Sequence, residues 1–343
     1  MRISCLFWRC LFGLACLPGL AFGATPTITS VSGSAQTGQI LTITGTSMVQ
    51  EDRSNWDPFL ANSQNASGFE GTSFTADGWE GGSSFSYVTD VKLMGSKSVR
   101  SRHSGAADQI NQHTNISYNS KLTIGGDLYF RAYLRFKVAN GIWADNYQKI
   151  FASYAPNGAF LDWIGNGGGP FTQVAIITNS NHYASIPGGA IQENRWYLVE
   201  LKLPSGSPHN YRAWIDNQLI MDFNDTRSPQ GTAWDMQFDI NHCCTTSGYS
   251  KDNWWDGFVV SKTRVGPASL IEIGNSPNYA TATKVYQAPE YLSDTSVRIK
   301  VNLSGLGSGP HYLWVTNNRG ERSPAYDFVA PGSYPNPQNL QVQ

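Results

Sequence analysis

Residues 25–46 read TPTITSVSGSAQTGQILTITGT and contain two short stretches in which apolar and polar residues alternate. These stretches, 27–31 and 39–44, show the period of two that is typical of half-buried β-strands. Two strands alone cannot bury their apolar face, and an isolated pair is only marginally stable in water. The rest of this sheet must therefore come from elsewhere in the chain.

Further strand-like stretches follow far along the sequence, at 270–273, 284–287, 297–302 and 312–316. Added to the first pair, they approach the roughly seven strands in roughly 100 residues of an immunoglobulin-like sandwich. We therefore predict a discontinuous Ig-like domain made of residues 24–50 and 268–330. The chain would leave it near 48–57 and re-enter near Pro267. The alternative is two unrelated fragments that flank a central core.

The two pieces together resemble the IPT/TIG family of Ig-like domains. The residues that carry the resemblance are Pro26–Gly33 (PTITSVSG), Gly38–Gly45 (GQILTITG), Ile271–Gly274 (IEIG), Trp314–Asn317 (WVTN) and Gly320. The resemblance implies a domain that spaces, displays or binds.

The first 23 residues have the pattern of a secretory signal peptide. Arg2 and Arg9 precede an apolar stretch at 11–22, and cleavage is expected after Gly23. No second hydrophobic stretch follows, so we predict a secreted, extracellular or periplasmic protein without a membrane span. Residues 331–343, with Pro335 and Pro337, are expected to form an extended tail.

The charge balance disfavours nucleic acid as a partner. Removing the signal peptide takes Arg2 and Arg9 from the 24 basic residues and leaves the 25 acidic ones, for a net charge of −3. No basic stripe remains that would suit nucleic acid or an anionic membrane.

The composition of 14% charged and 13% aromatic residues, with 34 glycines, favours many short strands joined by turns. Within the predicted insertion, 57–267, strand-like stretches recur and Asp216-Asn-Gln is expected to form a tight hairpin. The expected strands are 128–138, 149–153, 173–178, 196–203, 211–216, 236–241 and 258–265. We predict an all-β protein in which this insertion forms one β-sandwich or jelly roll.

The insertion resembles the concanavalin A-like lectin/glucanase jelly roll, in its laminin-G-like and polysaccharide-lyase-like branches. The matching segments are Asp127–Phe136, Gln148–Phe151, Trp196–Lys202, Tyr211–Asn217 and Trp254–Gly266. The resemblance implies the fold more strongly than an activity, because this fold hosts lectins, hydrolases and lyases alike.

One strand of the insertion suggests a binding surface. Leu128, Phe130, Ala132, Leu134 and Phe136 share one face, which we expect in the core. The candidate ligand-binding residues are Tyr129, Arg131, Tyr133 and Arg135 on the other face, with Lys149, Trp214 and Trp255 from other strands. Aromatic rings can stack on sugars, and arginines can pair with carboxylates, so this set predicts an acidic polysaccharide as ligand. The alternative is a solvated face whose long side chains cover apolar surface.

No catalytic residue is predicted. A retaining glycosidase needs two carboxylates roughly 5–5.5 Å apart, whereas Asp235 and Asp239 would lie roughly 13 Å apart along a strand. Groups that a lyase could use are present, among them Arg102 and His103. The Arg-x-Glu-x-Arg, Gln-x-His and Tyr-Phe-Lys-Ala-Gly motifs of jelly-roll alginate-type lyases are absent.

The sequence suggests two further sites, a cation site and a cysteine pair. The jelly-roll resemblance implies a structural Ca²⁺ held by Asp256, with Glu70 as a second candidate ligand. The alternative is that Asp256 caps a turn. Cys243 and Cys244 are adjacent, and in an oxidising compartment they are expected to form a strained vicinal disulfide or a structural pair. A metal site with His242 is the less favoured alternative.

The sequence leaves three possible functions open. The favoured one is a secreted or surface-displayed, non-catalytic, lectin-like protein that binds a polysaccharide or surface glycan. The second is a polysaccharide lyase with a non-standard site, which is the class expected if the protein is an enzyme. The third is a structural or adhesive surface component, or a phage-type decoration module.

Overall fold

The computed structural model describes the chain in thirteen ranges. These are residues 24–51, 53–56, 80–81, 85–104, 115–117, 126–139, 147–153, 160–165, 169–178, 181–205, 209–225, 236–239 and 250–328. All regular structure in these ranges is β-strand, so the predicted all-β fold is confirmed. Within the same ranges, no helix is long and apolar enough to cross a membrane.

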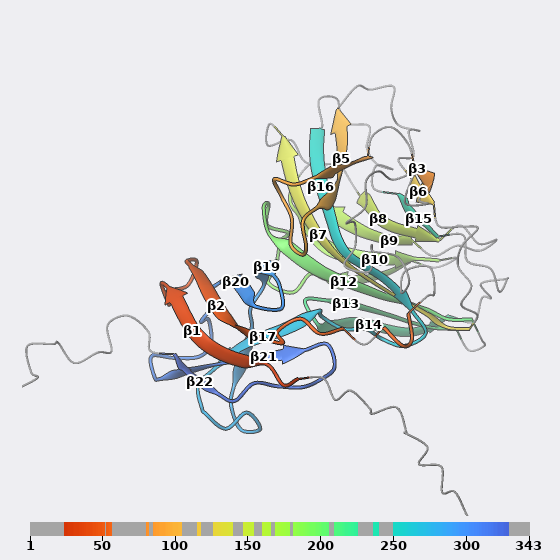
Figure 1. Cartoon of the computed structure of the whole chain (residues 1–343). Helices are drawn as coiled ribbons and strands as arrows, with labels where there is room; N and C mark the ends of the chain where they lie inside the picture. The colour runs from red at the N-terminus through yellow and green to blue at the C-terminus, as the bar shows by residue number, and fades with distance from the viewer. Residues whose placement is uncertain are drawn as a thin grey trace, which may run out of the picture.

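A smaller sandwich joins the two ends of the described chain (Figure 1). Its first sheet has the order β1 (Thr27–Gly33), β2 (Ile40–Thr46), β20 (Ser296–Lys300), β19 (Pro289–Leu292). Its second has the order β18 (Lys284–Tyr286), β17 (Ser269–Gly274), β21 (His311–Asn317), β22 (Tyr326–Phe328). Leu41 pairs with Ile299 and Ile43 with Val297, and all four side chains are buried. The predicted pairing of the first strands with the C-terminal segment is therefore present.

A larger sandwich of two seven-stranded sheets lies between these ends in the sequence. One sheet runs β14 (Gln218–Asp225), β13 (His209–Ile215), β12 (Trp196–Leu203), β7 (Leu128–Ala139), β16 (Ser250–Ser261), β5 (Ser98–Ser104), β4 (Phe85–Val88). The other runs β11 (Asn181–Ser185), β10 (Phe171–Ile177), β9 (Phe160–Gly165), β8 (Tyr147–Ser153), β15 (Met236–Asp239), β6 (Asn115–Ser117), β3 (Glu80–Gly81). We name them the β7 sheet and the β10 sheet. Together they form the jelly roll.

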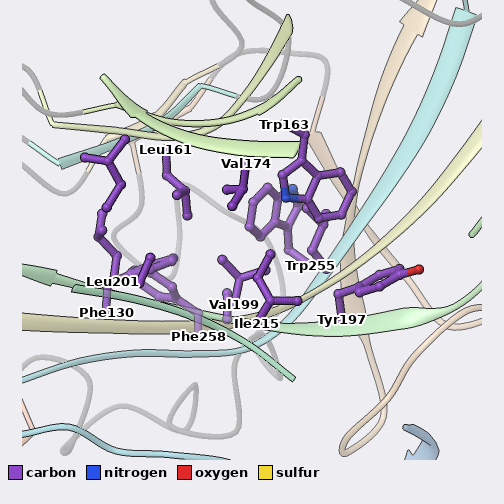
Figure 2. Packing of buried hydrophobic residues seen from close by; sticks show 14 of the residues in the cluster. Phe130, Leu161, Trp163, Val174, Tyr197, Val199, Leu201, Ile215, Trp255 and Phe258 are labelled. Atoms are coloured by element: carbon purple, nitrogen blue, oxygen red, sulfur yellow. The ribbon is translucent and has the colours of Figure 1, made fainter. Parts of the chain in front are cut away.

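The core of the jelly roll lies between the β7 and β10 sheets (Figure 2). The predicted core face of β7 is confirmed, since every one of its five side chains is buried in this cluster. Trp163 of β9 meets Tyr197 of β12 edge-on, with ring centroids 5.6 Å apart. Aromatic pairs in this geometry stabilise a core beyond the area that they bury.

The predicted hairpin between β13 and β14 is also present. Its two turn residues have positive φ angles, 50° at Asp216 and 64° at Asn217. Asn and Asp tolerate this left-handed backbone, which a two-residue type I′ turn requires. One expected strand differs, because β16 covers Ser250–Ser261 rather than 258–265. Its regular pairing with β7 shifts between Asp256 and Val259.

The two sandwiches share a second hydrophobic core. It combines Trp196, Leu198 and Trp254 of the β7 sheet with side chains of the smaller sandwich such as Ile271 and Leu292. The smaller sandwich therefore packs against the β7 sheet on the face that points away from the jelly-roll core. This contact decides which parts of the jelly roll remain available for a ligand.

Candidate functional site

The face of β7 that the sequence presents as a binding surface is closed at its centre. Arg131 and Tyr133 are both fully buried. The Arg131 guanidinium donates Nε–H to the Gly257 carbonyl at 3.0 Å and forms an ion pair with Glu51 at 2.5 Å. The Tyr133 hydroxyl accepts a hydrogen bond from the Ala268 N–H at 2.9 Å, and burial raises its pKa. The prediction that Arg131 and Tyr133 face a glycan is therefore wrong.

These side chains instead hold the two segments that connect the sandwiches. Glu51 lies on the segment that leaves the smaller sandwich, and Ala268 lies where the chain returns. Next to Arg131 on β12, buried Glu200 pairs with Arg264 at 2.5 Å and accepts the Gly266 N–H at 2.9 Å. The outward face of the β7 sheet is thus an anchor for both connections.

The remaining predicted residues on this face are engaged with neighbouring side chains. The Arg264 guanidinium lies 4.5 Å above the ring of Trp214, and the ring of Tyr129 lies 6.5 Å from it. Arg135 is 3.6 Å from Glu290 of the smaller sandwich. Burial lowers the pKa of Arg135 and raises that of Glu290, so the site offers a partly desolvated pair rather than a free cation.

The structure separates the other two predicted binding residues from this face. Trp255 is buried in the jelly-roll core, whereas its neighbour Trp254 points to the junction between the sandwiches. The prediction that Trp255 contacts a ligand is therefore wrong. Lys149 belongs to β8 of the β10 sheet, where it pairs with Asp162. The predicted set is consequently divided between two sheets and the core.

Asp256 has the contacts of an anchor. One carboxylate oxygen accepts the backbone N–H groups of Leu93 and Met94, each at 2.8 Å, and the other accepts the Gly257 N–H at 2.8 Å. These three bonds agree with the alternative in which Asp256 caps a turn, and the Ca²⁺ site stays a prediction. Among the described residues, no group of three or more acidic, histidine or cysteine side chains could hold a metal ion. The expected partner Glu70 lies outside the described residues.

Several other predicted features are outside the described ranges or only partly inside them. Cys243, Cys244 and the His242 alternative fall outside, as do residues 1–23 and 331–343. The backbone of β5 pairs Arg102 with Asp252 and His103 with Lys251. The disulfide, the signal peptide and the tail stay predictions.

The face of the β10 sheet that points away from the core offers a different arrangement. Tyr183 on β11 is 54% exposed, which makes it the most exposed large hydrophobic side chain in the described ranges. It pairs with Ala175 on β10, which pairs with Asp162 on β9, which pairs with Lys149 on β8. We call these four residues the Tyr183 row. The row crosses four strands over roughly 14 Å. Ala175 is fully buried, so the exposed end of the row is at Tyr183.

Alternation along the strands supports this orientation. On β11, Asn181, Tyr183 and Ser185 are exposed, while His182 and Ala184 are half-buried. His182 stacks on Phe223 of β14 with ring centroids 3.6 Å apart, and Ala184 packs against the jelly-roll core. The inward residues thereby fix the outward direction of Tyr183. No sequence signal singled out this tyrosine, because β11 was not among the expected strands.

No protein-family model matches the chain, and a comparison with curated proteins finds no match either. Solved structures to which the chain is similar include an endo-β-1,4-glucuronan lyase from the fungus Trichoderma reesei. The identity is 13% and the TM-score is 0.42, and the match covers 54% of this chain and 92% of that chain. The cellulose-induced protein Cip1 has 17% identity, coverages of 57% and 96% and a TM-score of 0.41. The alginate lyase Aly36B has 15% identity, coverages of 61% and 96% and a TM-score of 0.40. What this chain binds has to be inferred from its own surface.

Proposed function

We propose that this protein is a non-catalytic, lectin-like polysaccharide-binding protein that uses the outward face of the β10 sheet. The observation that carries the proposal is the Tyr183 ring, which is 54% exposed on the outward face of β11. An exposed aromatic ring can stack on a sugar face, and charged residues farther along a row can pair with hydroxyl or carboxylate groups. A row that crosses several strands suits an extended chain of sugars.

The spacing within the row favours binding over bond cleavage. Tyr183 and Lys149 are separated by three strand spacings, roughly 14 Å. A catalytic base and its partner must both reach the reacting atoms within hydrogen-bond distance. These two residues cannot do so at one sugar carbon.

The proposal also includes export and display. Residues 1–23 have the signal-peptide pattern, and the smaller sandwich resembles an IPT/TIG domain. The smaller sandwich packs against the opposite sheet of the jelly roll and leaves Tyr183 exposed. Individual contacts with sugars are weak, so affinity on the order of micromolar to millimolar is expected, strengthened where several copies act together.

Affinity electrophoresis in gels that contain alginate, glucuronan or a neutral glucan tests this proposal. Tyr183→Ala is expected to abolish retention, and Lys149→Gln to weaken it only in the acidic polymers. Leu219→Ala is the matched control, because Leu219 is 51% exposed on β14 of the other sheet. Retention of Tyr183→Ala equal to that of Leu219→Ala would remove the β10 face as the site. Unsaturated products released from alginate or glucuronan would identify a lyase instead.

A further inference from the structure

A cavity of about 630 Å³ lies where the two sandwiches meet. Its lining includes Glu51 and Arg53 from the first connecting segment and Met94 from the connection between β4 and β5. Tyr291 of β19 and Arg319 of the turn between β21 and β22 also line it. Ligand pockets in proteins typically measure roughly 300–1,000 Å³ and often lie at domain junctions. The volume and the place both suit a small organic molecule.

The charges that line this cavity do not cancel. Among the described lining residues Glu51 is the acidic one, and its carboxylate forms an ion pair with the buried Arg131. Glu321 follows Arg319 closely in the sequence, but its carboxylate accepts the side-chain amide of Asn317 at 2.8 Å. Among the described residues, neither Arg53 nor Arg319 forms a salt bridge. Within the part of the chain that the structure describes, the guanidinium groups of Arg53 and Arg319 are thus not neutralised by an ion pair.

Both arginines are exposed residues, with an ordered contact at the Arg53 guanidinium and at the Arg319 backbone. The Arg53 guanidinium lies over the ring of Trp56 at 5.5 Å. The backbone N–H of Arg319 donates to the Asn317 side-chain oxygen at 3.1 Å, and the same oxygen accepts the Glu321 N–H at 3.1 Å. A turn held in this way reduces the entropy that the Arg319 backbone would lose on binding.

We propose that this junction cavity binds a small organic carboxylate of the sugar-acid class. Arginine presents a planar fork of donors that matches a carboxylate in a bidentate arrangement. The Tyr291 ring and the Met94 side chain provide apolar walls for the remainder of the ligand. The ligand is a free sugar acid or the acidic end of a saccharide chain. This site is separate from the Tyr183 row, and its existence does not depend on the proposed polysaccharide binding.

Isothermal titration of the full chain with glucuronate, and in parallel with glucose, tests the charge requirement. The two sugars share a ring and differ at the carboxylate, so glucuronate is expected to bind and glucose to bind at least tenfold more weakly. Arg53→Gln and Arg319→Gln are each expected to weaken glucuronate binding at least tenfold. Lys262→Gln removes the same charge at an exposed position outside the lining and is expected to leave binding unchanged.

A glucuronan trisaccharide, titrated in the same way, separates the two sources of the carboxylate. Binding as tight as that of glucuronate indicates that a chain end enters, and loss of binding indicates a free sugar acid. Equal binding of glucose and glucuronate, no binding of glucuronate to the unmodified protein, or arginine variants that match Lys262→Gln would each overturn the proposal. Tyr183→Ala should bind glucuronate normally, so failure of this site is distinguishable from failure of the β10 face.

Discussion

Arg131 shows how the environment of a single residue changes its role. It stands on the outward face of β7, where alternation with tyrosines suggests a sugar-binding strip. In the folded chain its guanidinium is buried and bonds to Glu51 and to the Gly257 carbonyl. A buried charge is tolerated only when it is paired and hydrogen-bonded. Arg131 is therefore committed to holding the junction.

Replacing Arg131 by methionine should be strongly destabilising, because it leaves the Glu51 carboxylate buried without its partner. We expect a loss of about 3–5 kcal/mol in the free energy of unfolding, as for other broken buried pairs. Denaturant titration followed by tryptophan fluorescence measures it. Adding Glu51→Gln to Arg131→Met should restore part of the loss.

The control for this prediction is Arg212→Met. Arg212 pairs with Asp222 at 3.1 Å, but both side chains are about 40% exposed, at 43% and 39%. Exposed pairs contribute at most about 1 kcal/mol. If Arg131→Met and Arg212→Met lost similar stability, the anchoring role of Arg131 would be contradicted.

At the scale of elements, an irregularity in β16 lets one strand pair with β7 and also hold the segment that contains Leu93 and Met94. Its register against β7 shifts between Asp256 and Val259. Gly257 lies within the shift and has a φ of +56°. This geometry turns the Asp256 carboxylate toward the backbone of Leu93 and Met94. The same connection then meets the smaller sandwich, because the Leu292 N–H donates to the Leu93 carbonyl at 2.7 Å.

Gly257→Ala should cost more stability than any substitution that strains the backbone alone. A Cβ at this position would lie 2.9 Å from the Tyr133 ring and 3.0 Å from the Met94 sulfur, both in the packed junction. We expect about 1–3 kcal/mol of overpacking in addition to the strain of the positive φ. Thermal unfolding followed by circular dichroism provides the measurement.

Gly188→Ala isolates the backbone contribution. Gly188 has a φ of +85°, and a Cβ there would meet nothing within 4 Å. It should therefore lose only the strain energy, on the order of 1 kcal/mol. Equal melting temperatures for Gly257→Ala and Gly188→Ala would show that the junction yields to the added methyl group.

At the scale of the whole molecule, the two sandwiches share contacts that should make them unfold as one cooperative unit. A shared hydrophobic core, the Arg131–Glu51 and Arg264–Glu200 pairs, and the Tyr133 anchor all cross the junction or fix its connecting segments. Separate domains usually meet through smaller and more polar interfaces. Here neither sandwich can separate without exposing buried charge and apolar surface.

Differential scanning calorimetry should accordingly show a single transition for the full chain, with calorimetric and van't Hoff enthalpies that agree. Tyr133→Phe removes the hydrogen bond from Ala268. It should lower the free energy of unfolding by about 1 kcal/mol and still give a single transition. Two resolved transitions in the unmodified protein would contradict the cooperative junction.

The sequence by itself determined the strands with clear alternation, the core face of β7, the Asp216-Asn217 hairpin and the pairing of the first strands with the C-terminal segment. These features follow from local geometry, because alternation with a period of two specifies which residues share a face of the sheet. Only the tertiary structure decided what covers each face. It buried Arg131 and Tyr133 beneath the connecting segments, placed Trp254 at the junction and Trp255 in the core, and left Tyr183 exposed. Alternation cannot supply that information, because the cover comes from residues far away in the chain.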